Sequence, residues 1–304
     1  MEYRHRVTLV TTTFAPQTVH CHTPEMKSPP PLWMLRTAFR TVGAVAPGVA
    51  ARWAETIFCS PPRNEPRPGE EAFLATGSRL TVRNEDQDLA VWAWGNGAVV
   101  LLAHGWGSRA GRFSAMAAGL MQAGFRVVVF DAPAHGASMG SQASLPQFSR
   151  ALQSVAEAVG PVHSLIGHSL GGAAVSLALR QGLIAQRVVL LSPPADVVLF
   201  SHAFAEHLRI PSRVRSVMRR NLETRLRFRF EELHVPTLAR KMTAPALIIH
   251  DRDDPDVPYA HGQEIAGAWP GAQLVTTTGL GHRALLRDPE VIRRTVAFLR
   301  EEAR

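Results

Sequence analysis

The stretch Ile166-Gly167-His168-Ser169-Leu170-Gly171-Gly172 constrains the fold of this 304-residue chain more than any other. It lies between an apolar, strand-like run and a helical run rich in Ala and Leu. A Ser with Gly two residues before and after it fits a sharp strand-to-helix turn, where a flanking Cβ would clash with the crossing chain. Such a turn exposes the Ser169 hydroxyl at a sheet edge and places the Leu170 N–H at a helix start, where a developing oxyanion would be stabilised.

Apolar strands and helices alternate on both sides of this turn. We expect strands over residues 89–94, 98–103, 125–130, 161–166, 187–191, 246–250 and 272–277. We expect helices over residues 113–123, 145–159, 170–180, 260–268 and 289–302. The alternation predicts an α/β fold with a mostly parallel sheet covered on both faces. The turn Gly95-Asn96-Gly97 indicates a β-hairpin between the first two of these strands.

The chain divides into an extension, a core in two parts and an insertion. The extension covers residues 1–70, and the α/β core covers residues 71–194 and 244–304. Residues 195–243 have a helical pattern and no strand pattern, and the interval is too long for a simple connection. We therefore expect a short helical cap there, over the carboxyl edge of the sheet.

The extension itself has three segments. We expect residues 1–25 to be disordered or not normally translated, because Met26 begins a more ordinary start. Residues 35–58 have apolar side chains at helical spacing, interrupted by Pro47. They either pack on the core, which we favour, or lie on a membrane surface. The Pro-rich residues 60–70 predict an extended linker.

Composition limits the classes of partner and the cellular compartment that we expect for this protein. The net charge is +8, but no zinc or RNP pattern and no interleaved aromatic residues accompany it, so we expect no nucleic-acid partner. Cys21 and Cys59 form no disulfide framework, and no His/Cys/Asp cluster has metal-ligand spacing, so we expect no metal and no cofactor. These cysteines and the lack of a membrane-spanning run indicate a cytoplasmic protein.

A serine hydroxyl becomes a nucleophile only with a neighbouring base, which needs an orienting acid. After a turn of this kind, the acid and then the histidine are expected further along the chain. The apolar run Leu247–Ile249 leads into an acidic turn, residues 250–258, that ends in Val-Pro. His282 lies beyond it in the loop Thr278-Gly279-Leu280-Gly281-His282, after the last strand.

These motifs resemble those of serine hydrolases of the α/β-hydrolase superfamily over residues 75–302. The resemblance is carried by His104-Gly105-Trp106-Gly107, Asp131-Ala132-Pro133-Ala134-His135-Gly136-Ala137-Ser138, the Ser169 turn, the acidic turn and Gly281-His282. It implies the α/β-hydrolase fold, with Ser169 as nucleophile and His282 as general base. It also implies that the Trp106 and Leu170 N–H groups bind the oxyanion.

The family pattern of the acidic turn is Gly-x-x-Asp-x-x-Val-Pro. Asp251 replaces its Gly, and counting on three residues gives Asp254 as the acid, with Asp253 and Asp256 as alternatives. A second departure is Ala134, where the family commonly has Gly.

Three further histidines belong to the matching motifs. We expect His104 to bond the backbone beneath the site and His135 to order its loop, whereas His168 should point away from the site.

The cap carries eight arginines and one apolar pattern, and each can be interpreted in two ways. The arginines either select an anionic acyl group or form a solvated helix face, which we favour. Phe200, Phe204 and Leu208 recur at four-residue spacing, and either line an acyl pocket or, as we favour, pack within the cap. The arginines are Arg209, Arg213, Arg215, Arg219, Arg220, Arg225, Arg227 and Arg229.

The resemblance implies a carboxylesterase-like serine hydrolase that cleaves a small acyl ester or thioester through an acyl-enzyme. A cofactor-free perhydrolase with the same three side chains and a non-catalytic, ligand-binding scaffold are the alternatives. The pattern leaves acyl length, leaving group and oligomeric state open.

Overall fold

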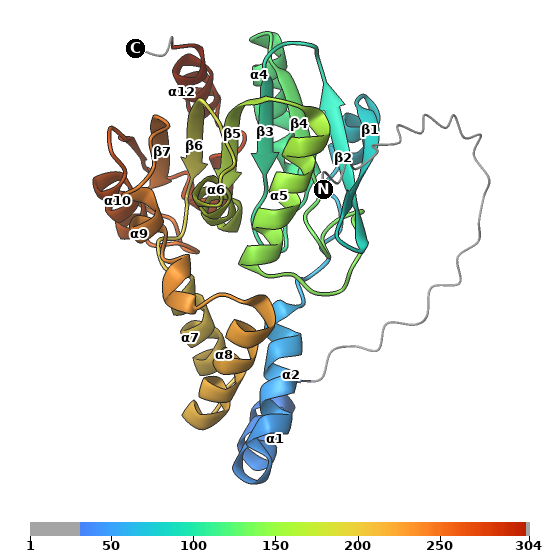
Figure 1. The fold of residues 1–304 in the computed structure, drawn as a ribbon, viewed down its shortest axis with the longest axis vertical. Coiled ribbons are helices and arrows are strands. Elements are labelled where there is room, and N and C mark those ends of the chain that lie inside the picture. The colour runs from blue at the N-terminus through green and yellow to red at the C-terminus, as the bar shows by residue number, and fades with distance from the viewer. Residues whose placement is uncertain (1–30, 302–304) are drawn as a thin grey trace, which may run out of the picture.

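The computed structural model describes residues 31–301, so the expectation for residues 1–25 lies outside the described residues. The described chain forms an eight-stranded sheet in the order β1-β2-β4-β3-β5-β6-β7-β8 (Figure 1). β1 and β4 both pair antiparallel with β2, and all other neighbours are parallel. The strands are β1 (Ser78–Asn84), β2 (Gln87–Trp94), β3 (Val99–Ala103), β4 (Arg126–Phe130), β5 (Val162–His168), β6 (Arg187–Leu191), β7 (Ala246–Asp251) and β8 (Gln273–Thr277).

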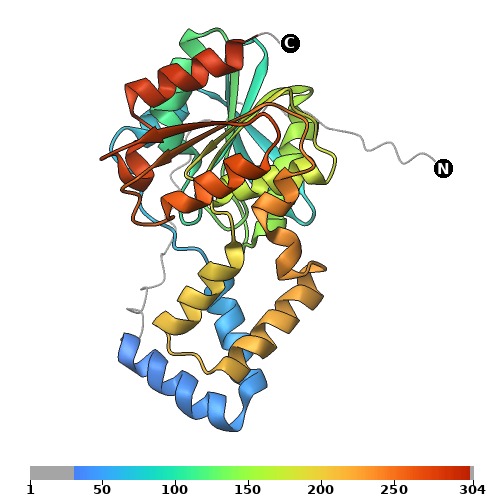
Figure 2. The same cartoon turned by 90° about the vertical axis from the view of Figure 1, so that its left-hand side faces the viewer.

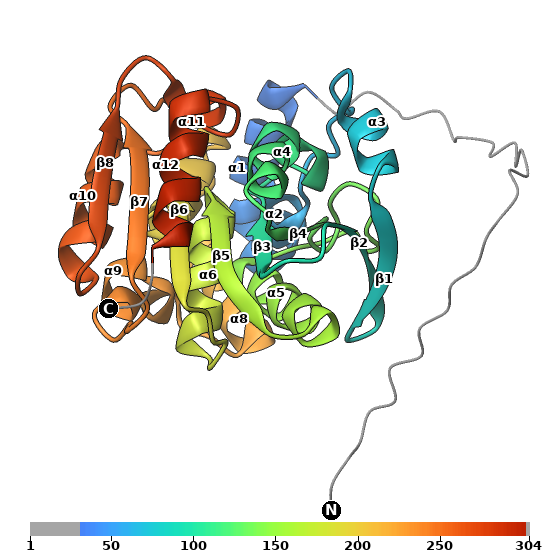
Figure 3. The same cartoon turned by 90° about the horizontal axis from the view of Figure 1, so that it is seen from above.

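Helices cover both faces of the sheet, as the alternation predicts (Figure 3). One face carries α3 (Glu70–Ala75), the 3-10 turn η1 (Ala110–Phe113), α4 (Ser114–Gln122), α11 (Gly281–Ala284) and α12 (Pro289–Arg300). The other carries α5 (Leu145–Val159), α6 (Leu170–Arg180), α9 (Val235–Ala239) and α10 (Tyr259–Ala268). β3 and β6 are buried along their whole length because helices cover them on both sides.

The predicted hairpin between residues 89–94 and 98–103 is wrong. β2 and β3 are not neighbours, because β4 lies between them and pairs with both. A Cβ on Gly97 would lie 1.9 Å from the Gly124 carbonyl oxygen, so the loop after β2 passes tightly over the start of β4. The hairpin that forms is β1–β2, turned at Glu85, which has φ +55°.

A second helical layer lies beyond the carboxyl edge of the sheet (Figure 2). It combines α1 (Leu32–Val45) and α2 (Pro47–Cys59) with α7 (Val197–His207) and α8 (Ser212–Leu226), and η2 (Phe230–Leu233) adds Phe230. Their apolar faces share one cluster around Phe39, Ala51, Val214 and Met218. The N-terminal helices therefore pack on the cap rather than on the sheet. The division into domains stays a prediction.

The Pro-rich residues 60–69 have no regular structure but are tied to two loops of the core. The Asn64 side chain donates to the Gly107 carbonyl at 2.8 Å. The Arg63 guanidinium donates to the carbonyls of Ala134, Ser138 and Gly140 at 3.3, 3.3 and 2.8 Å. We call residues 60–69 the strap. Among residues 31–301, none of the helices combines the length and apolar character that crossing a bilayer requires.

The shared cluster predicts that Met218→Ala destabilises the protein by about 2–5 kcal/mol, because it leaves a cavity between α8 and the N-terminal helices. Urea denaturation followed by circular dichroism measures this loss. Met139 is 54% exposed and serves as the matched control, so Met139→Ala should change stability by less than about 0.5 kcal/mol. Equal effects of the two substitutions would contradict the packing of this layer.

Candidate active site

Ser169 occupies a sharp turn between β5 and α6 with φ +53° and ψ −127°. Its N–H donates to the Leu191 carbonyl at 2.9 Å, which ties the turn to β6. A Cβ on Gly167 would lie 2.6 Å from the Gly171 carbonyl oxygen, and one on Gly171 would lie 2.1 Å from that of Ala103. Only glycine fits at both positions, so the spacing seen in the sequence is a steric requirement of this turn.

The His104–Gly107 loop packs directly against Ser169. A Cβ on Gly105 would lie 2.8 Å from the Ser169 Cβ, which explains the glycine. Trp106 and Leu170 line the same cavity as Ser169. Among residues 31–301, their backbone N–H groups have no hydrogen-bond acceptor, so both donors are available to a ligand.

Two buried histidines brace this loop, as expected for His104 and His135. His135 Nε2 accepts the Gly107 N–H at 3.0 Å, so its Nδ1–H donates to the Pro133 carbonyl at 2.8 Å. His104 Nε2 accepts the Ala132 N–H at 3.0 Å, and its Nδ1–H donates to the Gly105 carbonyl at 2.7 Å. Burial lowers the pKa of His104 to about 4 and that of His135 to about 3, so both rings are neutral.

Ala134 lies in the left-handed region with φ +64°, which suits a glycine. Arg63 of the strap donates a hydrogen bond to the Ala134 carbonyl oxygen and so helps to hold this conformation. The departure from the family pattern therefore leaves the loop fold intact.

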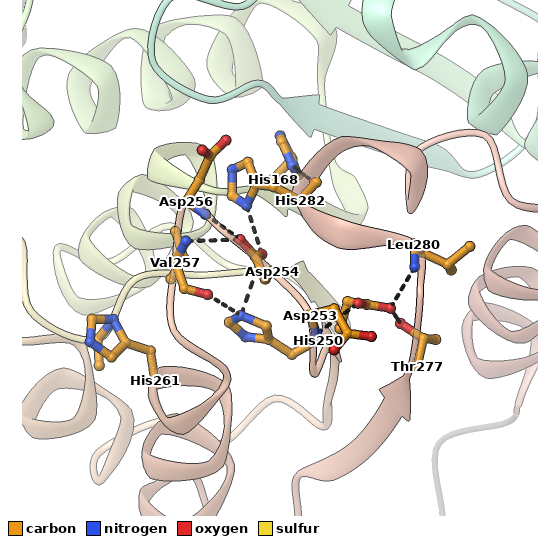
Figure 4. A network of polar contacts seen from close by, with 12 residues as sticks. His168, His250, Asp253, Asp254, Asp256, Val257, His261, Thr277, Leu280 and His282 are labelled. Atoms are coloured by element: carbon orange, nitrogen blue, oxygen red, sulfur yellow. Dashed lines mark hydrogen bonds and ion pairs between the residues drawn. The ribbon is translucent and has the colours of Figure 1, made fainter.

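Of the three candidate acids, Asp254 lies closest to the His282 ring (Figure 4). His282 Nδ1–H donates to Asp254 Oδ2 at 2.8 Å, and the Val257 N–H donates to Oδ1 at 2.8 Å. Burial raises the pKa of Asp254, but the hydrogen bonds from His282 and Val257 outweigh it and hold that pKa at about 2. Asp254 is thus an ionised, buried partner of the His282 ring.

The neighbouring carboxylates hold the two loops together. Asp253 accepts the Gly279 N–H at 2.9 Å, and Asp251 accepts the Leu280 N–H at 3.1 Å. Asp256 forms an ion pair with Arg283 at 3.0 Å. Asp251, which stands where the family pattern has Gly, therefore fixes the start of the His282 loop.

His168 differs from its expectation. Its ring lies against the His282 ring, with centroids 4.7 Å apart, and its Nε2–H donates to the His282 carbonyl at 2.9 Å. The prediction that it points away from the site is wrong, because α11 returns the chain directly over β5. Burial lowers the pKa of His168 to about 3, so a neutral ring supports His282.

His250 is a site-supporting residue that the sequence analysis missed. It is fully buried, and its Nε2–H donates to the Val257 carbonyl at 3.0 Å, with Asp254 Oδ2 at 3.5 Å (Figure 4). Gly262 of α10 has no Cβ because the His250 ring fills that space. A histidine near the end of the apolar strand β7 was a sign of such a role in the sequence. Its partner, the Val257 carbonyl, is brought to it by the conformation of the acidic turn.

One cavity of about 980 Å³ joins these groups, lined by Ser169, His282, Trp106 and Leu170. Phe200 and Phe204 line it too, whereas Leu208 packs in the cap cluster. The favoured prediction of packing within the cap therefore holds for Leu208 and in part for Phe204, which packs against the cap cluster and also lines the cavity, whereas Phe200 belongs to the cavity lining. None of the eight cap arginines lines this cavity, which agrees with the favoured prediction of a solvated helix face.

The sequence model of the Alpha/beta hydrolase family matches residues 100–295. The chain belongs to this family. The match begins in β3 and runs into α12, so it includes the Ser169 turn, the acidic turn and the His282 loop. It leaves out the N-terminal helices and the strap.

Solved structures share the α/β-hydrolase fold at low sequence identity. An esterase from Pyrococcus furiosus superposes with a TM-score of 0.62 at 21% identity, over 79% of this chain and 98% of that one. An esterase from Rhodococcus gives 0.58 at 18%, over 73% and 98%. A bromoperoxidase from Bacillus anthracis gives 0.58 at 17%, over 74% and 100%. A search of curated proteins finds no match.

The part of the chain from residue 31 to residue 301 contains no group of three or more His, Cys, Asp or Glu side chains that could hold a metal ion.

The buried histidines predict a loss of stability in mild acid. Unfolding returns His104, His135 and His168 to a pKa near 6.5, whereas the folded values are about 4, 3 and 3. Between about pH 6 and 4 the unfolded chain therefore binds more protons, and stability falls by up to about 1.4 kcal/mol per pH unit for each histidine. Denaturant titrations at pH 7.5, 6 and 5 measure the slope.

His135→Gln should reduce this pH slope, since one of the histidines with a lowered pKa no longer titrates. His207 is exposed on α7, so His207→Gln should keep the slope of the unmodified protein. A stability that does not change between pH 6 and 4.5 would contradict the neutral state of the buried rings.

Proposed function

We propose that this protein is a serine hydrolase that cleaves a carboxylic ester or thioester through an acyl-enzyme. The observation that carries the proposal is the 2.8 Å contact between Asp254 and His282 in the wall of the cavity that Ser169 lines. A neutral imidazole whose Nδ1–H is held by a carboxylate presents its Nε2 lone pair as a base.

In the proposed reaction, Ser169 Oγ attacks the substrate carbonyl carbon and His282 Nε2 takes the hydroxyl proton. The oxygen of the tetrahedral intermediate accepts hydrogen bonds from the free N–H groups of Trp106 and Leu170, and Asp254 stabilises the imidazolium. The imidazolium then gives its proton to the departing alcohol or thiol, which leaves the acyl group on Ser169. Water, deprotonated by His282, attacks this acyl-enzyme and releases the carboxylic acid.

The family and its esterase neighbours support a hydrolase, and the site's geometry favours catalysis over a scaffold that only binds a ligand. A scaffold that only binds a ligand has no need of two unpaired N–H donors beside a serine in a strained turn. A perhydrolase would use the same groups with hydrogen peroxide in place of water. Comparing acid and peracid release with and without peroxide separates it from a hydrolase.

Ser169→Ala should lower kcat for 4-nitrophenyl butanoate by at least about 10³-fold, because the acyl-enzyme cannot form. The same variant should lose labelling by a fluorophosphonate probe. Ser216, exposed on α8, provides the matched control, so Ser216→Ala should keep both activity and labelling. Turnover or labelling that survives in Ser169→Ala would overturn the proposal.

Exchanging the three candidate acids tests the assignment of Asp254. Asp254→Asn should lower kcat by about 10²- to 10⁴-fold, because the amide does not stabilise the imidazolium and permits the wrong tautomer. Asp253→Asn and Asp256→Asn should change kcat by less than about tenfold, since their contacts are with Gly279 and Arg283. Steady-state kinetics on one ester compares them. A larger loss at Asp253 or Asp256 would reassign the acid.

A further inference from the structure

The side chains that line the cavity beside Ser169 fall into two chemically different groups, which we call its basic end and its apolar end. One end is lined by four arginines, Arg67, Arg112, Arg283 and Arg287, with only two acidic residues, Glu70 and Asp256. The other end is apolar and lies under the cap, where it is lined by Phe200, Phe204, Leu222, Leu226 and Phe230. A small molecule that fills both ends therefore has an apolar part and an anionic part.

The basic end is built by elements on one face of the sheet. Arg67 belongs to the strap before α3, Arg112 to η1, and Arg283 to α11. α3, η1 and the residues that flank α11, Leu280 and Leu285, contribute to the same apolar cluster, which fixes their relative positions. The cap helices α7 and α8 belong to a different cluster. The two ends thus come from separate layers, with Ser169 and His282 in the cavity that both layers line.

Ion pairs within the protein neutralise only part of this charge. Arg112 pairs with the buried Glu70 at 2.8 Å, and Arg283 pairs with Asp256 at 3.0 Å in a solvated position. Within residues 31–301, Arg67 and Arg287 form no ion pair. Burial lowers the pKa of Arg112, and although Glu70 raises it, Arg67, Arg109 and Arg283 lower it further, so the arginines lie within one another's fields.

The position of His282 decides which part of a substrate would meet these arginines. In the proposed reaction the imidazolium donates its proton to the leaving atom, so the leaving group departs on the side of α11. Arg283 and Arg287 lie on or directly after α11, one and five residues beyond His282. The apolar end is then left for the acyl group.

We propose that the four arginines form a subsite for an anionic leaving group, so that the substrate joins an apolar acyl chain to an alcohol or thiol carrying a carboxylate or phosphate. The inference rests on the proposed function and specifies its substrate class. Arginine suits both anions, since its planar guanidinium binds either through two parallel hydrogen bonds. The cap arginines, which do not line the cavity, have no part in this selection.

Two pairs of probes with one acyl group test the subsite. 4-Carboxyphenyl butanoate is compared with the neutral 4-carbamoylphenyl butanoate, and butanoyl-coenzyme A with the neutral butanoyl thioester of N-acetylcysteamine. We expect a kcat/KM about tenfold higher for the anionic member at low ionic strength. Each arginine attracts the anion only modestly, but the attractions of the four arginines add up. The preference should shrink in 0.5 M NaCl, where charges are screened within about 4 Å. If the preference appears in just one of the two pairs, that pair identifies the anion that the subsite binds.

The double variant Arg67→Gln/Arg287→Gln should reduce the anionic-to-neutral ratio of kcat/KM to about one or two. These residues are chosen because neither leaves an acidic partner unpaired. Arg293→Gln/Arg294→Gln removes the same charge from the outer surface of α12, away from the cavity, and should preserve the ratio. Equal ratios in all three proteins, or a preference lost equally in both double variants, would overturn the subsite.

Two further measurements separate the failure of the subsite from failure of the proposed function. Calorimetry on Ser169→Ala should show tighter binding of 4-carboxyphenyl butanoate than of its neutral analogue, whether or not the native protein turns either over. Neutral esters hydrolysed without any anionic preference would refute the subsite and leave the hydrolase standing. A stronger preference for a charged acyl group, 4-nitrophenyl hemiglutarate over 4-nitrophenyl pentanoate, would reverse the assignment of the two ends and overturn the proposal.

Discussion

The close approach of β3 to the first turn of α6 is the constraint on which the site depends. Gly171 lies so near the backbone of Ala103 and His104 that a single added carbon would overlap it. This contact brings the His104–Gly107 loop against Ser169 and leaves the N–H groups of Trp106 and Leu170 free beside it. In the proposed reaction, a hydroxyl and two donors held by backbone packing would need no rearrangement, which is what electrostatic preorganisation requires.

Neutral histidines provide much of the rigidity around that contact. His104 and His135 link the His104–Gly107 loop to residues 131–138, while His168 and His250 support the His282 loop and the acidic turn. Each ring joins two backbone segments through a buried donor or acceptor. In His104 and His135 both ring nitrogens are paired, and buried pairs of this kind favour a single loop conformation because an unpaired member would be costly.

The sequence predicted the local parts of this structure well. α5, α6 and β6 have the predicted bounds, because their apolar periodicity and their flanking Gly, Pro and Ser residues are local signals. The β2–β3 hairpin failed because the partner of β2 is β4, which is distant in sequence. β1 escaped detection because its edge position leaves most of its side chains exposed. The Asp254–His282 contact followed from motif spacing, whereas the role of His250 depends on a turn that only the folded chain forms.

The end of α2 and the strap give the N-terminal extension a share in the cavity wall. Ile57, Phe58 and Asn64 line the cavity, yet all three precede the segment that matches the family. A chain trimmed to that matched segment would lose β1 and β2, one side of the pocket and the brace on Gly107. Part of the cavity wall is therefore made by residues that a comparison restricted to the shared hydrolase core never aligns.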